Sequence, residues 1–174
     1  MAVGKRGDIG WFSPDPRAVI PLDEWFHVPH GLRRVLKKNP FEITVDREFE
    51  TVMRACAKRH EGTWISDEIV ESYSNLHRLG FAHSVEARLG DKLVGGLYGV
   101  HIGGAFFGES MFHRVTDASK VSLVALVERL RAGSFALLDT QWTTPHLEQF
   151  GTTEIPRRDY LRLLKKAVAL DCKF

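Results

Sequence analysis

The chain has 174 residues, of which 44% are hydrophobic and 26% charged, and its formal net charge is +2. This length suffices for one domain with its own core, and the composition is that expected of a soluble globular protein. No apolar run approaches the roughly 20 residues of a membrane span, and the N-terminus lacks a secretory signal, so we expect a cytoplasmic protein with no membrane partner. Two distant cysteines, Cys56 and Cys172, predict neither a disulfide framework nor a zinc site.

Residues 1–40 are predicted to be an irregular segment, rich in Pro and Trp, that contains a basic helix. In this helix "LRRVLKK" places four cations on one face, and "PRRDYLRLLKK" repeats the pattern near the C-terminus. The cations are Arg33, Arg34, Lys37 and Lys38, and Arg158, Arg162, Lys165 and Lys166. The apolar residues predicted to face inward are Leu32, Val35, Leu36, Leu161, Leu164 and Val168. Such faces are either ordinary solvated surfaces or a footprint for nucleic-acid phosphates.

The next segment combines one strand with two helices. "FEITV" alternates and predicts a strand over 41–45, after which Asp46 is a candidate cap for a helix over 47–60. The apolar stripe of this helix includes Cys56, which we expect to be plain core. Ser66 is a good N-cap for a second helix that runs to Leu79.

The centre of the chain is predicted to be mainly β. "AHSVEARL" alternates over 82–89, and "GDK" then turns a hairpin. The elements expected after it are strands at 93–101 and 104–109, a buried helix at 117–132, a strand at 134–140, a short helix at 145–150, a strand at 152–155 and the basic C-terminal helix. An antiparallel run followed by a β-α-β crossover predicts one α+β domain over 41–174, with a GNAT-like mixed sheet flanked by helices.

No sequence signal for a cofactor is found. The glycines of "GGLYGVHIGG" lie in strand and hairpin context, and no glycine-rich basic turn precedes the helix at 117 to hold the pyrophosphate of coenzyme A. The chain has no P-loop and no dinucleotide fingerprint, and its histidines lack ligand spacing. His113 and His146 are nevertheless candidates to lie near a site. We therefore expect neither a cofactor nor a metal.

Two carboxylates are candidate functional groups. Glu109 lies among apolar residues in "GESMFHR", and Asp139 follows an apolar run and shares a side with Gln141 two positions on. Strand ends in open sheets form ligand clefts, which favours a site at these residues. The structural alternatives are that Glu109 forms a buried salt bridge, for instance with Arg114, and that Asp139 caps the turn after its strand.

Long motifs carry a family resemblance. "SPDPRAV", "EGTWI", "AHSVE", "LVGGLYGV", "GESMFHR", "LLDTQ" and "EIPRRDYL" occur in an order that resembles the leucyl/phenylalanyl-tRNA–protein transferases, in a form lacking most of the usual N-terminal domain. The resemblance implies an enzyme that moves Leu, Phe or sometimes Met from its tRNA to the N-terminal amine of proteins that begin with Arg or Lys, and so marks them for proteolysis. Its partners would be aminoacyl-tRNA and these acceptors, with the chain itself a monomer. The donor ester is already activated, which explains why no coenzyme is needed.

The resemblance also implies site residues. Asp139 and Gln141 match the family's catalytic D-x-Q pair, with Thr140 where Cys is usual, and Glu109 matches its acidic residue. The residues matching the substrate pocket are Trp64, Leu97, Phe106, Gly108, Met111, Leu126 and Leu138. Trp11 is the candidate counterpart of a tryptophan used near the terminal adenosine of tRNA.

The chemistry of aminolysis suggests roles for the acidic residues. The acceptor amine has a pKa of about 7.7–8.0, so a carboxylate that takes its proton would help, and we expect Asp139, placed by Gln141, to do so. Glu109 would hold the donor ammonium. Two alternatives remain: a transferase of the same class with acidic N-termini as acceptors, and a non-catalytic module that binds tRNA or N-termini. The retained "DTQ" and "GES" argue against the module.

Overall fold

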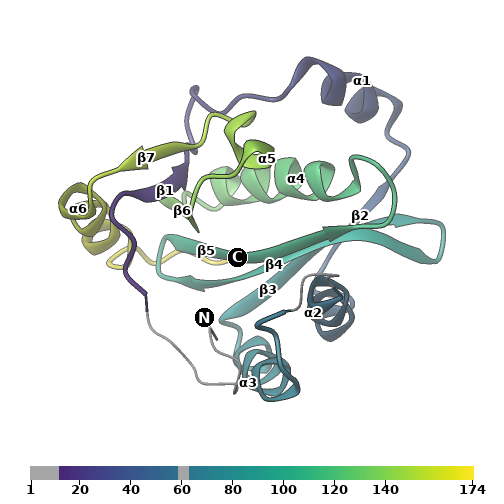
Figure 1. Cartoon of the computed structure of the whole chain (residues 1–174), viewed down its shortest axis with the longest axis horizontal. Helices are drawn as coiled ribbons and strands as arrows, with labels where there is room; N and C mark the ends of the chain where they lie inside the picture. The colour runs from purple at the N-terminus through teal and green to yellow at the C-terminus, as the bar shows by residue number, and fades with distance from the viewer. Residues whose placement is uncertain (1–11, 59–62) are drawn as a thin grey trace.

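A computed structural model describes residues 12–58 and 63–174, and within them the chain forms one mixed sheet with helices on both faces (Figure 1). The sheet order is β2-β3-β4-β5-β6-β1-β7, and every neighbouring pair is antiparallel except the parallel pair β5–β6. The strands are β1 Arg17–Ile20, β2 Glu42–Val45, β3 Ala82–Leu89, β4 Lys92–Ile102, β5 Ala105–His113, β6 Leu137–Gln141 and β7 Thr153–Ile155. This arrangement confirms the predicted α+β, GNAT-like fold.

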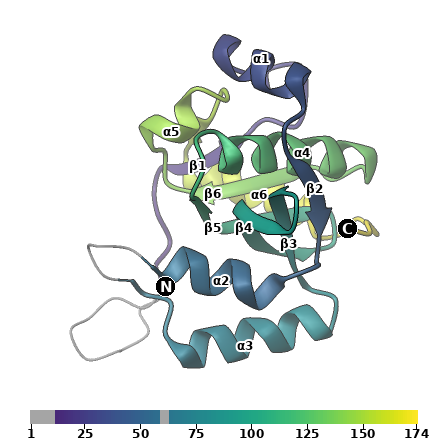
Figure 2. The same cartoon turned by 90° about the vertical axis from the view of Figure 1, so that its right-hand side faces the viewer.

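The helices form two layers. They are α1 His30–Lys38, α2 Phe49–Ala57, α3 Asp67–Arg78, α4 Ala118–Ala132, α5 Pro145–Glu148 and α6 Arg157–Ala167. Helix α4 crosses one face of the sheet, whereas α2 and α3 cover the other (Figure 2). The apolar core is correspondingly divided, with Leu126 and Leu130 of α4 in one cluster and Val52 and Met53 of α2 in another.

Several local predictions are confirmed. Ser66 caps α3, since its Oγ accepts a hydrogen bond from Ile69 N at 3.3 Å. Strand β3 has the predicted bounds, and the hairpin to β4 turns at Gly90, where φ is +55°. Cys56 is a buried core residue. Strand β5 is longer than predicted and continues to His113.

The predicted cap of α2 is wrong. The Asp46 carboxylate accepts a hydrogen bond from Ser84 N at 2.8 Å and contacts His83 Nδ1 at 2.7 Å, so it is committed to β3. Glu86 instead receives the backbone N–H groups of Arg47 and Glu48 that precede the helix. The helix begins at Phe49, and its predicted last residues, 59 and 60, lie outside the described part of the chain.

The N-terminal segment is not irregular throughout. Arg17–Ile20 form β1, which pairs with β6 and β7 and so joins this segment to the same sheet as the later strands. The predicted inner face of α6 is also wrong in part, because Leu161 is 52% exposed and Val168 39% exposed, and the buried residues are Tyr160 and Ala167. In the described residues, no helix is long and apolar enough to cross a membrane.

Candidate active site

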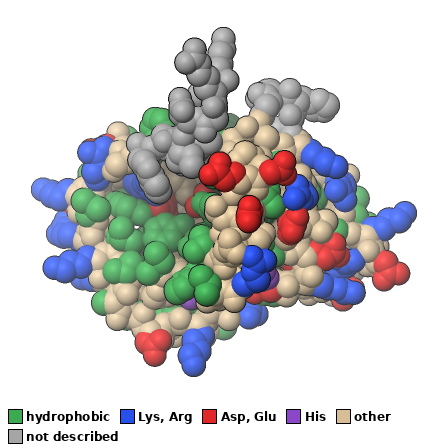
Figure 3. Space-filling model, turned by 90° about the horizontal axis from the view of Figure 1, so that it is seen from below, with side chains coloured by type: hydrophobic (Ala, Val, Ile, Leu, Met, Phe, Trp, Pro, Cys, Tyr) green, Lys and Arg blue, Asp and Glu red, His purple; other side chains and the backbone are tan. Residues whose placement is uncertain are grey.

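A cavity of about 730 Å³ opens where two strands part. Strands β5 and β6 pair in parallel, from Ala105 opposite Leu137 to Phe107 opposite Asp139. Beyond that last pair, residues of both strands line the cavity. On one face of the molecule, apolar side chains gather around a hollow, with Lys and Arg side chains at its edge (Figure 3). The size and the mixed lining are typical of a small-molecule or peptide site.

Glu109 occupies a β-bulge in β5. Gly108 pairs with Gly99 and Ser110 pairs with Tyr98, so Glu109 has no opposite residue on β4. A bulge re-aims the side chain of the extra residue, and here that side chain lines the cavity. The expectation that Glu109 ends a strand is therefore wrong, because it lies inside β5.

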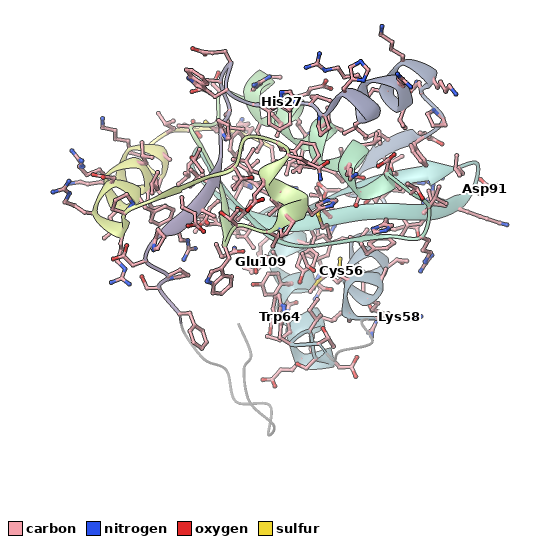
Figure 4. All side chains as sticks on the ribbon, turned by 45° about the horizontal axis from the view of Figure 1, so that its top comes forward. His27, Cys56, Lys58, Trp64, Asp91 and Glu109 are labelled. Atoms are coloured by element: carbon pink, nitrogen blue, oxygen red, sulfur yellow. The ribbon has the colours of Figure 1, made fainter. Side chains whose placement is uncertain are left out.

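The Glu109 carboxylate forms no ion pair with any residue that the structure describes. Burial raises its pKa above the usual range, and the hydrogen bond from Tyr73 offsets only part of this effect. The alternative of a salt bridge with Arg114 is not seen, since Arg114 donates to the Leu93 carbonyl at 3.0 Å. Trp64 also lines the cavity, from the segment that leads into α3, and lies below Glu109 in Figure 4.

Asp139 has the opposite environment. Its carboxylate is fully buried and accepts hydrogen bonds from Arg17 Nη2 at 2.6 Å and Nε at 3.0 Å, from Tyr160 Oη at 2.6 Å and from Gln141 N at 2.8 Å. The bond from Gln141 N is the turn cap that we considered as an alternative role. Asp139 is not among the described residues that line the cavity, whereas Gln141 is.

Most of the predicted pocket residues meet at the cavity. Those lining it are Trp64, Leu97, Gly108, Met111, Leu126 and Leu138, together with Glu109 and Gln141. Phe106 does not line it: the ring is fully buried and stacks on Phe174 with centroids 5.3 Å apart. Trp11 lies outside the described residues.

Two important residues were missed in the sequence. Arg17 lines the cavity and Tyr160 does not, and both donate hydrogen bonds to Asp139, which is 122 positions from Arg17. The only signal for them was their place in "SPDPRAV" and "EIPRRDYL". His113 and His146 also line the cavity, as anticipated, and burial, followed by the charges of Lys120 and His113, lowers the pKa of His146.

The two basic helices are exposed but do not form one patch. Helices α1 and α6 lie far apart in Figure 1. All eight cations are exposed, and on α6 both Arg158 and Arg162 contact Asp159. A phosphate footprint on these helices therefore has two separate parts. Of the four predicted cations on α6, Lys165 and Lys166 have no acidic partner among the described residues.

Comparison with known proteins agrees with this geometry. A family model described as leucyl/phenylalanyl-tRNA protein transferase matches residues 19–165. The chain is 58% identical over 170 residues to a leucyl/phenylalanyl-tRNA–protein transferase of Akkermansia muciniphila, covering 97% of this chain and 88% of that protein. Proteins of the same name from Herpetosiphon aurantiacus and Gloeobacter violaceus are 57% and 56% identical, covering 97% and 100% of this chain and 87% and 89% of those proteins. The chain belongs to the leucyl/phenylalanyl-tRNA–protein transferase family.

Proposed function

We propose that this chain transfers a leucyl or phenylalanyl group, and to a lesser extent a methionyl group, from tRNA to the N-terminal amine of acceptor proteins that begin with Arg or Lys. The donor class follows from the family. The Arg or Lys acceptor and the marking of the product for proteolysis rest on the sequence resemblance alone.

The single observation that carries the proposal is Glu109 in its apolar cavity. An aminoacyl ester presents an α-ammonium next to an apolar side chain, and the cavity offers a carboxylate next to Leu97, Met111, Leu126 and Leu138. An apolar pocket distinguishes side chains by only about 1–3 kcal/mol per methylene, so use of Leu, Phe and Met by one pocket is physically natural.

The reaction needs little chemistry from the protein. The neutral acceptor amine attacks the ester carbonyl carbon, an amide bond forms, and the ester bond to the terminal ribose breaks as the ribose oxygen takes a proton. With an amine pKa of about 7.7–8.0, a substantial fraction of the nucleophile is already neutral near pH 7.5. Holding both substrates in one cavity supplies much of the remaining acceleration.

Asp139 has a different place in this scheme from the one expected. Its oxygens are occupied by Arg17, Tyr160 and the Gln141 N–H, so it is a positioning residue rather than a proton acceptor. Through the bond that it accepts from Gln141 N, it fixes the backbone of Gln141, whose side chain is left to contact the substrates in the cavity. For tRNA, we propose the exposed cations of α1 and α6 as the phosphate contacts.

A single-turnover transfer assay tests the function. Leucyl-, phenylalanyl- and methionyl-tRNA are offered with peptides that differ only in the first residue, Arg, Lys, Asp or Glu, and an N-acetylated Arg peptide serves as the control. We expect transfer to the Arg and Lys peptides and none to the acetylated one. Transfer to the acidic peptides alone would establish the alternative acceptor class. Binding of charged tRNA without any transfer would establish the binding module and contradict the enzyme.

A further inference from the structure

The guanidinium of Arg17 is held rigidly at the edge of the cavity. Its Nε and Nη2 donate to Asp139, and its Cζ lies 4.9 Å from the centre of the Tyr160 ring, which adds a cation–π contact. The side chain lines the cavity and is 15% exposed. Within the described residues no acceptor is found for Nη1, so this end of a fixed cation remains available to a substrate.

Arg17 and Glu109 have opposite charges in one cavity. Both line it, Arg17 at the start of β1 and Glu109 in the bulge of β5, and their charges attract each other across it. An aminoacyl ester has a matching pair of groups, because its α-ammonium and its carbonyl oxygen are separated by only three bonds. A donor whose ammonium binds Glu109 can therefore turn its carbonyl oxygen towards Arg17.

We propose that Arg17 is a catalytic residue, which donates an N–H to the ester carbonyl oxygen of the donor and stabilises the oxyanion that forms there; this inference rests on the proposed function. When the amine nitrogen attacks, the electron pair of the C=O bond moves to that oxygen. It returns when the bond to the ribose oxygen breaks and the amine proton passes to the leaving oxygen. A hydrogen-bonding group such as Arg17 that is already fixed in place needs no reorganisation in the transition state. This is the condition under which such stabilisation is large.

Asp139 acquires a clear function in this arrangement. The guanidinium of Arg17 and the carboxylate of Asp139 form a planar, bidentate hydrogen-bonded pair, and this pair fixes the plane of the guanidinium at the cavity edge. Tyr160 supports both members, since it donates to Asp139 and lies under Arg17. The charge that meets the substrate belongs to Arg17, and the charge of Asp139 orients it.

The test compares Arg17→Met with Asp139→Asn. Single-turnover transfer from saturating phenylalanyl-tRNA to an Arg-starting peptide is measured with the Kd of charged and of uncharged tRNA and with thermal melts. We expect Arg17→Met to lower the rate by roughly 10²–10³-fold, as for loss of one oxyanion donor, with both Kd values nearly unchanged. Asp139→Asn should lose less, because it keeps Arg17 in place, and Arg17→Lys should lie between Arg17→Met and wild type. Arg54→Met, at an exposed arginine that does not line the cavity, is the matched control and should transfer at the wild-type rate.

Each other outcome overturns the inference. A greater loss in Asp139→Asn than in Arg17→Met would make Asp139 the reacting group. Weaker binding of uncharged tRNA by Arg17→Met, in proportion to its rate loss, would assign Arg17 to a tRNA phosphate instead. If Arg17→Met folds poorly, the double variant with Arg17→Met and Asp139→Leu removes both buried charges and should fold again. Recovery of transfer in the double variant would show that Arg17 has only a structural role. Failure of the wild type to transfer would instead contradict the proposed function, so the two ideas fail separately.

Discussion

Glu109 and Asp139 lie close together on neighbouring strands and have opposite environments. Phe107 of β5 is the register partner of Asp139 on β6, and Glu109 follows two residues later. Asp139 is enclosed by a guanidinium, a phenol and a backbone N–H, whereas Glu109 lines the cavity and receives a hydrogen bond from Tyr73. The same chemical group is thus paired with a guanidinium in one place, whereas in the other it forms no ion pair with a described residue and faces Arg17 only across the cavity.

This difference separates a structural from a substrate-binding role. A buried carboxylate that is fully paired contributes to the fold, and its removal leaves its partner unpaired. A buried carboxylate without a cationic partner costs stability until a ligand supplies the charge, which is common at functional sites. The comparison therefore predicts that substitutions of the two residues change stability in opposite directions.

The largest effect on stability is expected for Asp139→Ala. It leaves Arg17 without its carboxylate in a largely buried place, and breaking a buried pair costs about 3–5 kcal/mol. Urea denaturation followed by circular dichroism measures the change, with Asp171→Ala at an exposed position as the control. A loss below about 1 kcal/mol, the level of an exposed ion pair, would show that Asp139 is not structurally important.

A somewhat smaller loss is expected for Leu126→Ala, together with altered donor choice. Leu126 is buried and lines the cavity, so truncation should cost about 2–5 kcal/mol and enlarge the donor pocket. We expect the preference for Phe over Leu to rise by at least about tenfold, the lower end of the effect of a single methylene in an apolar pocket. Competition between the two charged tRNAs measures it. Phe106→Leu is the control, because Phe106 does not line the cavity and its substitution should leave donor choice unchanged. Altered donor choice in Phe106→Leu but not in Leu126→Ala would show that the donor pocket is not this cavity.

The smallest effects concern the basic helices, which lie outside both carboxylate sites. Replacing Lys165 and Lys166 by Gln should lower the slope of log K against log salt for tRNA binding by about 0.9 for each lost phosphate contact, with little change in Tm. The matching α1 variant replaces Lys37 and Lys38, and Lys92→Gln in the β3–β4 hairpin is the control. Unchanged slopes for both helix variants would place the tRNA surface elsewhere.

The sequence was most informative where structure is determined locally. The Ser66 cap, the hairpin turn at Gly90 and the apolar helix α4 depend on nearby residues, and all three were predicted. The polar partners were predicted less well, because they come from distant parts of the chain. Asp46 follows a local cap pattern, but Ser84 and His83 on β3 compete for its carboxylate.

The candidate site shows the same division. The position of Glu109 among apolar residues suggested a functional carboxylate, but its bulge depends on the register between β4 and β5, which local periodicity does not specify. The burial of Asp139 could not be predicted either, because Arg17 is 122 positions away and becomes its neighbour only when β1 pairs with β6. The predicted inward face of α6 failed at Leu161, since Tyr160 faces inward to bind Asp139.

Glu109→Gln gives the most direct test of the central claim, that Glu109 is kept charged for a substrate. Gln keeps the size and can still accept the bond from Tyr73. Because burial raises the pKa of Glu109, its charged form is less stable in the folded than in the unfolded chain, and the stability that the protonated form contributes is lost as the pH rises through that raised pKa. At pH 7.5 the variant should therefore melt above the wild type, with a difference that shrinks as the pH is lowered, while kcat/KM for phenylalanyl-tRNA falls by roughly 10–100-fold through loss of a charged hydrogen bond. A Glu109→Gln variant that melts below the wild type, or that uses phenylalanyl-tRNA as well as the wild type does, would contradict the account.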